Sequence, residues 1–151
     1  MYGLGRRCCA ELLGTMLAIY LGNSVVANAL LPGSKGQGMG FGWLAVGYSF
    51  AFMFAGLLFS HVSAYLNPAF TLAAVVCGEL SLATCLALAA AELAGAFLGG
   101  VATWLHYLPH FKTVPGESQE AGRSWQKPTR VGYTCLKLLS RRGGSSMGIS
   151  S

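Results

Sequence analysis

Near the middle of the chain the sequence reads Ser63-Ala64-Tyr65-Leu66-Asn67-Pro68-Ala69-Phe70-Thr71-Leu72-Ala73. This segment belongs to an apolar stretch, residues 64–77, which is too short to cross a bilayer because a spanning helix needs about 20 residues. Pro68 suits the first position of a helix, since it lacks a backbone N–H, and Asn67 is a favoured cap residue. A helix over residues 67–77 would be about 16 Å long, close to half of a hydrocarbon core of about 30 Å. The spacing predicts a re-entrant half-helix.

Three longer apolar runs surround this segment, and each is long enough to span a membrane. They cover residues 8–31, 41–60 and 82–108. The first run is too long for the apolar core of a signal peptide, which has about 7 to 15 residues. We therefore expect an all-α, integral, multi-pass membrane protein, with three transmembrane helices and one half-helix in a domain over residues 1–111.

The composition supports this class of protein. Of the 151 residues, 54% are hydrophobic and 10% are charged, whereas an ordinary soluble domain has about 25% charged residues. The net charge of +5 comes from residues 112–151, which we expect to form a flexible basic tail. A basic tail is not a basic face on a fold, so we expect no nucleic-acid partner.

The sequence offers no catalytic or metal-binding constellation. It contains no aspartate, and its five cysteines form no Cys-x-x-Cys pair. We therefore expect neither an enzyme nor a cofactor.

The start of the half-helix is the candidate functional site. At mid-membrane, a helix N-terminus presents unpaired N–H groups and a partial positive charge, which disfavours cations and leaves neutral solutes unopposed. The Asn67 amide would add two donors, and extended backbone at Ser63, Ala64 and Tyr65 would expose carbonyl acceptors. An Asn-Pro pair is also an ordinary helix cap. Its place within an apolar stretch favours the pore interpretation, because non-helical backbone at membrane depth is buried or lines a cavity.

Several stretches resemble the first half of the aquaporin family in order and spacing. They are Ala10-Glu11-Leu12-Leu13-Gly14-Thr15, the central segment given above, and Glu92-Leu93-Ala94-Gly95-Ala96-Phe97-Leu98-Gly99. Residues 22–28 and 107–111 look more like the glycerol-facilitator branch. The resemblance implies half of an inverted-repeat channel fold, which the family assembles from two three-helix halves into tetramers. It also implies passage of water or small neutral solutes such as glycerol.

The resemblance also implies roles for particular residues. Asn67, Pro68 and Ala69 would form the first Asn-Pro-Ala motif of the pore. Tyr48 would contribute an aromatic ring to the selectivity constriction, and Ser63, Ala64 and Tyr65 would line the pore beside the motif. These last residues depart from the family pattern, which has a Gly and a His here, at the bend of the chain.

Two carboxylates are candidates for supporting this loop. The resemblance implies that Glu11 holds it by hydrogen bonds, and an intramembrane carboxylate is costly unless it is paired. Glu11 could instead be interfacial, because it lies only a few residues into its run. Glu92 stands where the family usually has Gln. His61 fits a polar position at the pore mouth, and an ordinary loop histidine is the alternative.

We expect the chain to be truncated and incomplete as a pore, because it carries one half and one Asn-Pro-Ala motif. Its partners would be the lipid bilayer, water or a small neutral solute, and further channel subunits in a homo- or hetero-oligomer. Arg6 and Arg7 and the basic tail favour opposite orientations of the same three spans. The alternative function is a non-conducting membrane protein that modulates the assembly of full-length channels.

Overall fold

The computed structural model describes residues 2–113, and within this range the chain is helical with no strand. The helices are α1 (Leu4–Leu30), α2 (Phe41–Phe59), α3 (Pro68–Val76) and α4 (Leu82–Thr113). By length and composition α1, α2 and residues 82–111 of α4 can cross a membrane. The predicted all-α class and its three spanning helices are confirmed.

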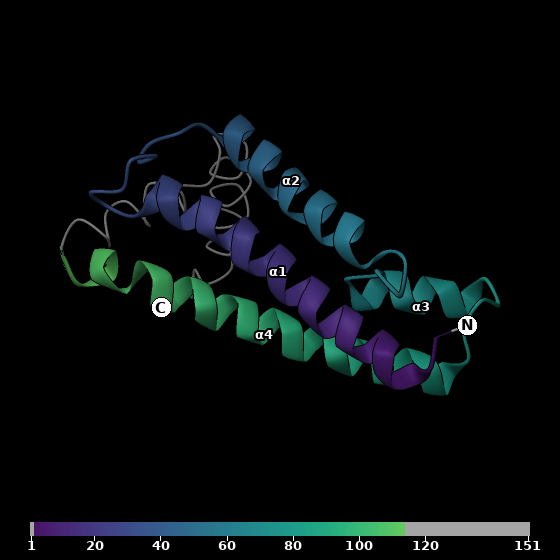
Figure 1. Cartoon of the computed structure of the whole chain (residues 1–151). Coiled ribbons are helices and arrows are strands. Elements are labelled where there is room, and N and C mark those ends of the chain that lie inside the picture. Colours follow the sequence, from purple (N-terminus) through teal and green to yellow (C-terminus); the bar gives the residue numbers. More distant parts are fainter. Residues whose placement is uncertain (1, 114–151) are drawn as a thin grey trace, which may run out of the picture.

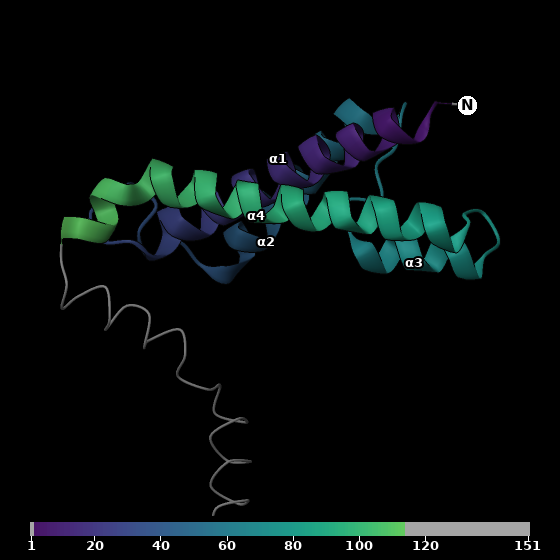
Figure 2. The ribbon, with the colours of Figure 1, turned by 90° about the horizontal axis from the view of Figure 1, so that it is seen from below.

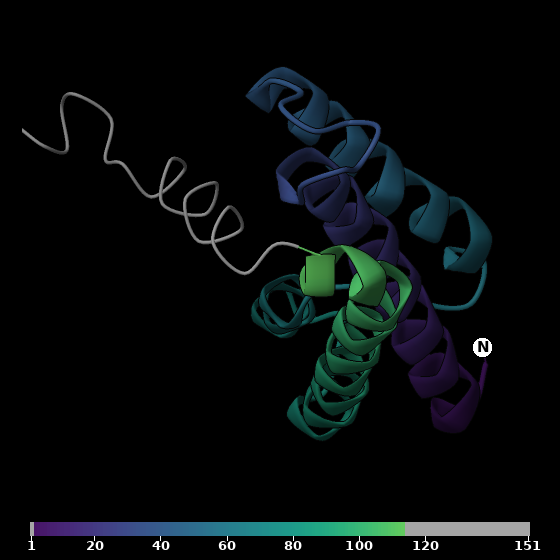
Figure 3. The same ribbon diagram turned by 90° about the vertical axis from the view of Figure 1, so that its left-hand side faces the viewer.

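The long helix α1 lies at the centre of the arrangement. It packs against α2 on one side and α4 on the other, while α3 packs against α4 (Figures 1 and 3). Seen from below, α3 runs beside the first part of α4 and in the opposite direction (Figure 2). The chain therefore leaves α2, turns back into the bundle, and returns along α3 to the end where α4 begins.

Small residues allow the central helix to approach its neighbours closely. A Cβ atom added to Gly95 would clash with the backbone carbonyl of Leu12, and one added to Gly99 would lie 2.6 Å from the carbonyl oxygen of Met16. Gly14 faces the Leu66 side chain, and Gly22 faces the Tyr48 ring. Close backbone packing through small residues is how helices associate in lipid, where the hydrophobic effect contributes little.

The helix ends differ slightly from the predicted runs. Helix α1 begins at Leu4 and not at residue 8, because Arg6 and Arg7 are good helix formers that extend its first turns. Helix α2 ends at Phe59. The half-helix was expected to begin at residue 67 and occupies Pro68–Val76, with Asn67 as its cap.

Helix α4 continues through Pro109 to Thr113, beyond the predicted end at residue 108. Proline removes one helical hydrogen bond. Next to it, however, His110 Nδ1 lies 3.2 Å from the carbonyl oxygen of Pro32, and the His110 ring packs on Tyr107. These contacts tie the end of α4 to the loop after α1. The first two residues of the predicted tail belong to α4, and residues 114–151 lie outside the described part of the chain.

Candidate functional site

The connection between α2 and α3 has an irregular backbone that turns sharply at Leu66. Leu66 has φ 55°, the single positive φ of a non-glycine residue among residues 2–113, and Asn67 after it is extended. A left-handed conformation costs an ordinary residue about 1–2 kcal/mol. The bend therefore forms without the glycine of the family pattern, and its neighbours must offset that cost.

Glu11 supplies the contacts that hold this bend. Its side chain is fully buried, and its carboxylate accepts hydrogen bonds from the Ser63 hydroxyl (2.6 Å), the Tyr65 N–H (2.9 Å) and the Leu66 N–H (2.8 Å). Hydrogen bonds to a charged group contribute more than neutral ones, at about 1.5–3 kcal/mol each. The three hydrogen bonds to Glu11 together contribute more free energy than the left-handed conformation of Leu66 costs. They also connect α1 to the start of the half-helix.

Asn67 caps α3 with both its side chain and its backbone. Its Oδ1 accepts from the Ala69 N–H (2.9 Å), while its carbonyl oxygen accepts from Phe70 N–H (2.9 Å) and Thr71 N–H (3.1 Å). Pro68 has no N–H to satisfy. The expectation of unpaired N–H groups at this helix end is therefore wrong, because the local cap satisfies them.

Two kinds of polar group remain available at this position. Among residues 2–113, the Asn67 Nδ2 group donates to no other residue, so both of its hydrogens are free. In the same part of the chain, the carbonyl oxygens of Ser63, Ala64 and Tyr65 accept no hydrogen bond. The site thus combines a free amide donor with a row of free acceptors.

Helix α3 is fixed to α4 by a buried pair. The Thr71 hydroxyl donates to Glu92 Oε1 at 2.5 Å, and both side chains are fully buried. The other oxygen of Glu92 is buried and has no hydrogen-bond partner among the described residues, and the Glu11 side chain lies near this carboxyl. Glu92 is ten residues into α4, so the pair lies about 15 Å along that helix. This bond therefore fixes the first turn of α3 against the middle of the first half of α4.

Two hollows flank the irregular segment. One, of about 520 Å³, is lined by residues that include Ser63, Ala64, Tyr65 and Glu79. The other, of about 460 Å³, is lined by residues that include Ala64 and Tyr65 and by residues of α2 and α3. The segment therefore forms a wall shared by two cavities.

Tyr48 lies apart from this cluster. Its hydroxyl donates to Asn23 Oδ1, and its ring covers Gly22 on α1. Gly22 is eight residues beyond Gly14, the residue that Leu66 contacts, so Tyr48 is about 12 Å further along α1. The structure does not bring Tyr48 to Asn67.

Sequence reasoning missed two polar partners, Asn23 and Thr71. Both were detectable as isolated polar residues within apolar runs, where a side chain of this kind needs a hydrogen-bond partner. Within the described residues, no group of three or more His, Cys, Asp or Glu could hold a metal ion.

Comparison with known protein families shows to which family this chain belongs. The model of the family described as "Major intrinsic protein" matches residues 2–128, which is most of the chain. The chain belongs to the major intrinsic protein family. Since residues 2–113 of this member contain three helices able to cross a membrane, it is an integral, multi-pass membrane protein.

Several curated relatives of this chain are named as glycerol facilitators. "Glycerol uptake facilitator protein 3" of Lactiplantibacillus plantarum is 38% identical over 112 residues, which cover 74% of this chain and 47% of the relative. "Glycerol uptake facilitator protein" of Streptococcus pneumoniae is 39% identical over 103 residues, covering 68% and 44%. "Probable glycerol uptake facilitator protein" of Thermotoga maritima is 38% identical over 104 residues, again covering 68% and 44%. This family member thus spans about half the length of the curated relatives it matches, and no solved structure matches it.

Proposed function

We propose that residues 2–113 form one half of a channel that passes water or small neutral solutes such as glycerol. The observation that carries this proposal is the free Nδ2 amide of Asn67 at the start of a half-helix whose backbone N–H groups are already capped. The names of the three relatives support glycerol as a solute. Membership of a family of transporters supports transport and not catalysis.

The geometry suits a solute that both donates and accepts hydrogen bonds. Asn67 Nδ2 offers donors, and the carbonyl oxygens of Ser63, Ala64 and Tyr65 offer acceptors, so water or a polyol could exchange its hydration for contacts with the wall. The partial positive charge at the start of α3 would oppose cations and protons. In this proposal Pro68 and Ala69 form the motif with Asn67, Tyr48 narrows the path above it, and Glu11 and Glu92 hold the loop in place.

A complementary half is needed to close the path. Helix α3 leaves large apolar side chains uncovered, with Phe70 66%, Leu72 53% and Val76 83% exposed. The polar end of α3 beside them would face lipid, where an unsatisfied group costs several kcal/mol. We therefore propose that this chain conducts only when another half covers α3, within an assembly of several subunits.

The same uncovered face favours a second candidate function. A chain that carries one half and exposes α3 could occupy the place of a matching half in a full-length relative. It would then be a non-conducting partner that alters the assembly of complete channels. This function predicts association with a longer relative and no solute flux by the chain alone.

Stopped-flow measurement of proteoliposomes separates these functions. Residues 1–113 are joined to the second half of the Lactiplantibacillus plantarum relative, and glycerol and water permeability are compared with those of the unmodified chain. We expect the fusion to be permeable and the unmodified chain to stay at the lipid background. Asn67→Ser keeps a capping oxygen but removes the amide donors, so it should lower permeability with the fold intact.

Asn28→Ser is the matched control, because Asn28 Oδ1 bonds the Gly36 N–H at the far end of α1. It should leave permeability unchanged. An impermeable, correctly folded fusion would contradict the channel proposal. Co-purification of the unmodified chain with a longer relative would then support the second function.

A further inference from the structure

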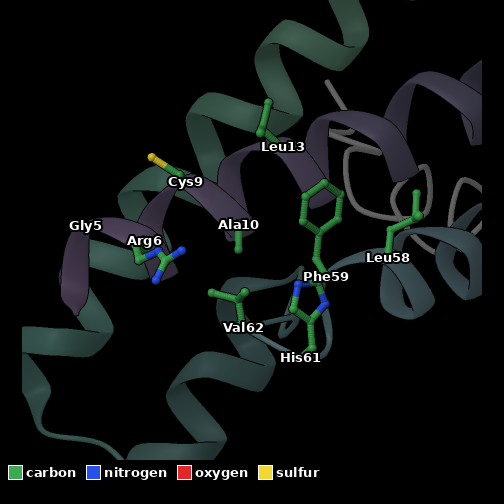
Figure 4. Close-up of a pocket in the computed structure, with 9 residues that line it drawn as sticks. All are labelled: Gly5, Arg6, Cys9, Ala10, Leu13, Leu58, Phe59, His61 and Val62. Atoms are coloured by element: carbon green, nitrogen blue, oxygen red, sulfur yellow. The ribbon is translucent and has the colours of Figure 1, made fainter. Parts of the chain in front are cut away.

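A separate hollow lies between the first turns of α1 and the end of α2 (Figure 4). This hollow, which we call the α1–α2 groove, has a volume of about 580 Å³. Its lining includes Arg6 and Leu13 from α1, Leu58 and Phe59 from α2, and His61 and Val62 from the connection that follows. It shares only Val62 with the 520 Å³ hollow beside Ser63, so it is distinct from the proposed pore.

The charge in the groove has one sign. Among the described residues that line it, Arg6 and His61 are basic and none is acidic. Figure 4 shows Arg6 extending from α1 toward Val62, with His61 beyond it. Arg6 is exposed, lies over the Tyr2 ring at 5.2 Å, and makes no ion pair among residues 2–113. Its charge is therefore available to an anion.

Polarity changes with depth along the groove. Arg6 lies in the first turn of α1, and Leu13 is seven residues further, which is about 10 Å deeper in the membrane. On the other wall, Leu58 belongs to α2 and precedes His61 in the sequence. Leu13 and Leu58 are 48% and 56% exposed. The groove thus has a cationic end at headgroup depth, at Arg6, and an apolar part further in, at Leu13 and Leu58. This order matches that of a phospholipid, which has a charged headgroup above apolar acyl chains.

We infer that the α1–α2 groove binds an anionic phospholipid, with its phosphate at Arg6 and His61 and an acyl chain along Leu13 and Leu58. Charge complementarity selects this occupant. The ammonium group of a zwitterionic lipid would meet two basic residues and no carboxylate in the groove. The attraction of an anionic headgroup to one basic residue corresponds to about a five-fold higher affinity for an anionic lipid than for a zwitterionic one.

Native mass spectrometry of the full chain tests this inference. The chain is released from nanodiscs that contain phosphatidylglycerol and phosphatidylcholine, and bound lipids are counted. We expect phosphatidylglycerol to be enriched by about five-fold over its share in the bilayer. Arg6→Gln should abolish the enrichment, and His61→Gln should reduce it.

Arg7→Gln is the matched control, because Arg7 is the adjacent arginine and lines the other hollow, near Glu79. It should keep the enrichment. Equal losses in the Arg6 and Arg7 variants would indicate a general surface attraction and would overturn the inference. So would enrichment that persists in Arg6→Gln, or full competition by the water-soluble headgroup glycerophosphoglycerol.

A second measurement uses the unmodified chain and does not depend on the folding of a variant. Phosphatidylglycerol with a photoreactive group in its acyl chain should label the peptides that contain Leu13 or Leu58. Labelling confined to other lipid-facing helices would overturn the inference. Cross-linking between two copies through Cys9, which also lines the groove, would show that a second chain occupies it and would overturn it as well.

Discussion

Replacing Glu11 by Gln should destabilise the fold by removing the anchor of the half-helix. The carboxylate receives hydrogen bonds on both oxygens, from the Tyr65 N–H on Oε1 and from the Leu66 N–H on Oε2. A glutamine has only one oxygen, so it can serve one of these backbone donors and must present its NH₂ group to the other. The Ser63 hydroxyl can rotate to suit either group.

The expected loss follows from these contacts. A buried donor left without an acceptor costs about 1–3 kcal/mol, and the bonds that remain lose the contribution of the charge. We expect Glu11→Gln to lower the free energy of unfolding by about 2–4 kcal/mol. Glu11→Ala should cost more, because it leaves two backbone N–H groups unsatisfied. Leu66 would then lose the contacts that offset its left-handed conformation.

The assay is reversible unfolding in mixed micelles of increasing SDS content, followed by circular dichroism. Glu79→Gln provides the control, since it makes the same chemical change at an exposed residue and should alter stability by less than about 0.5 kcal/mol. Interhelical hydrogen bonds in membranes contribute about 0.6 kcal/mol on average. A loss no larger than this for Glu11→Gln would refute the anchoring role.

Three further substitutions test helix packing and buried hydrogen bonds by the same unfolding assay. Gly95→Ala should lower the free energy of unfolding by about 1–3 kcal/mol, because its new Cβ meets the backbone of α1. The control Gly100→Ala has open space around its Cβ and should leave stability unchanged or raise it. Equal changes in stability for the two variants would contradict the close approach of α1 and α4. Glu92→Gln should change stability by less than about 1 kcal/mol or raise it, since the amide oxygen still accepts a hydrogen bond from the Thr71 hydroxyl and the new NH₂ group replaces an oxygen without a partner beside Glu11, whose carboxyl can accept from it. A loss above about 3 kcal/mol would show that both carboxyl oxygens of Glu92 are needed. Tyr48→Phe should cost about 1 kcal/mol by deleting the hydrogen bond to Asn23, and an unchanged stability would show that this bond contributes nothing.

The sequence was sufficient for the elements of the fold. Run length identified the three spanning helices, and an Asn-Pro pair inside an apolar stretch identified the start of α3 to within one residue. Helix ends were harder to predict. Whether Pro109 ends α4 depends on contacts such as that of His110 with the loop after α1, which no local pattern contains.

The site was predicted less completely than the fold. The sequence made Asn67 a candidate, but it could not show that Asn67 caps its own helix and leaves only Nδ2 free. It also could not pair Glu92 with Thr71, because that bond depends on how far along α4 the half-helix begins. Leu66 was not expected to adopt a positive φ, and the hydrogen bonds from Tyr65 and Leu66 to Glu11 that help to offset its cost join residues far apart in the sequence.

The depth of α3 in the bilayer tests the central claim most directly. Spin labels are placed singly at Ser60, Ala69 and Cys77, all of which are exposed, in an otherwise cysteine-free chain in liposomes. Their depths are then measured by relaxation with oxygen and a water-soluble nickel complex. Ala69 is eight residues from Cys77, so a half-helix predicts that Ala69 lies up to about 12 Å deeper, with Ser60 and Cys77 both shallow and near the same surface. Equal depths for all three labels, or Ser60 and Cys77 at opposite surfaces, would contradict it.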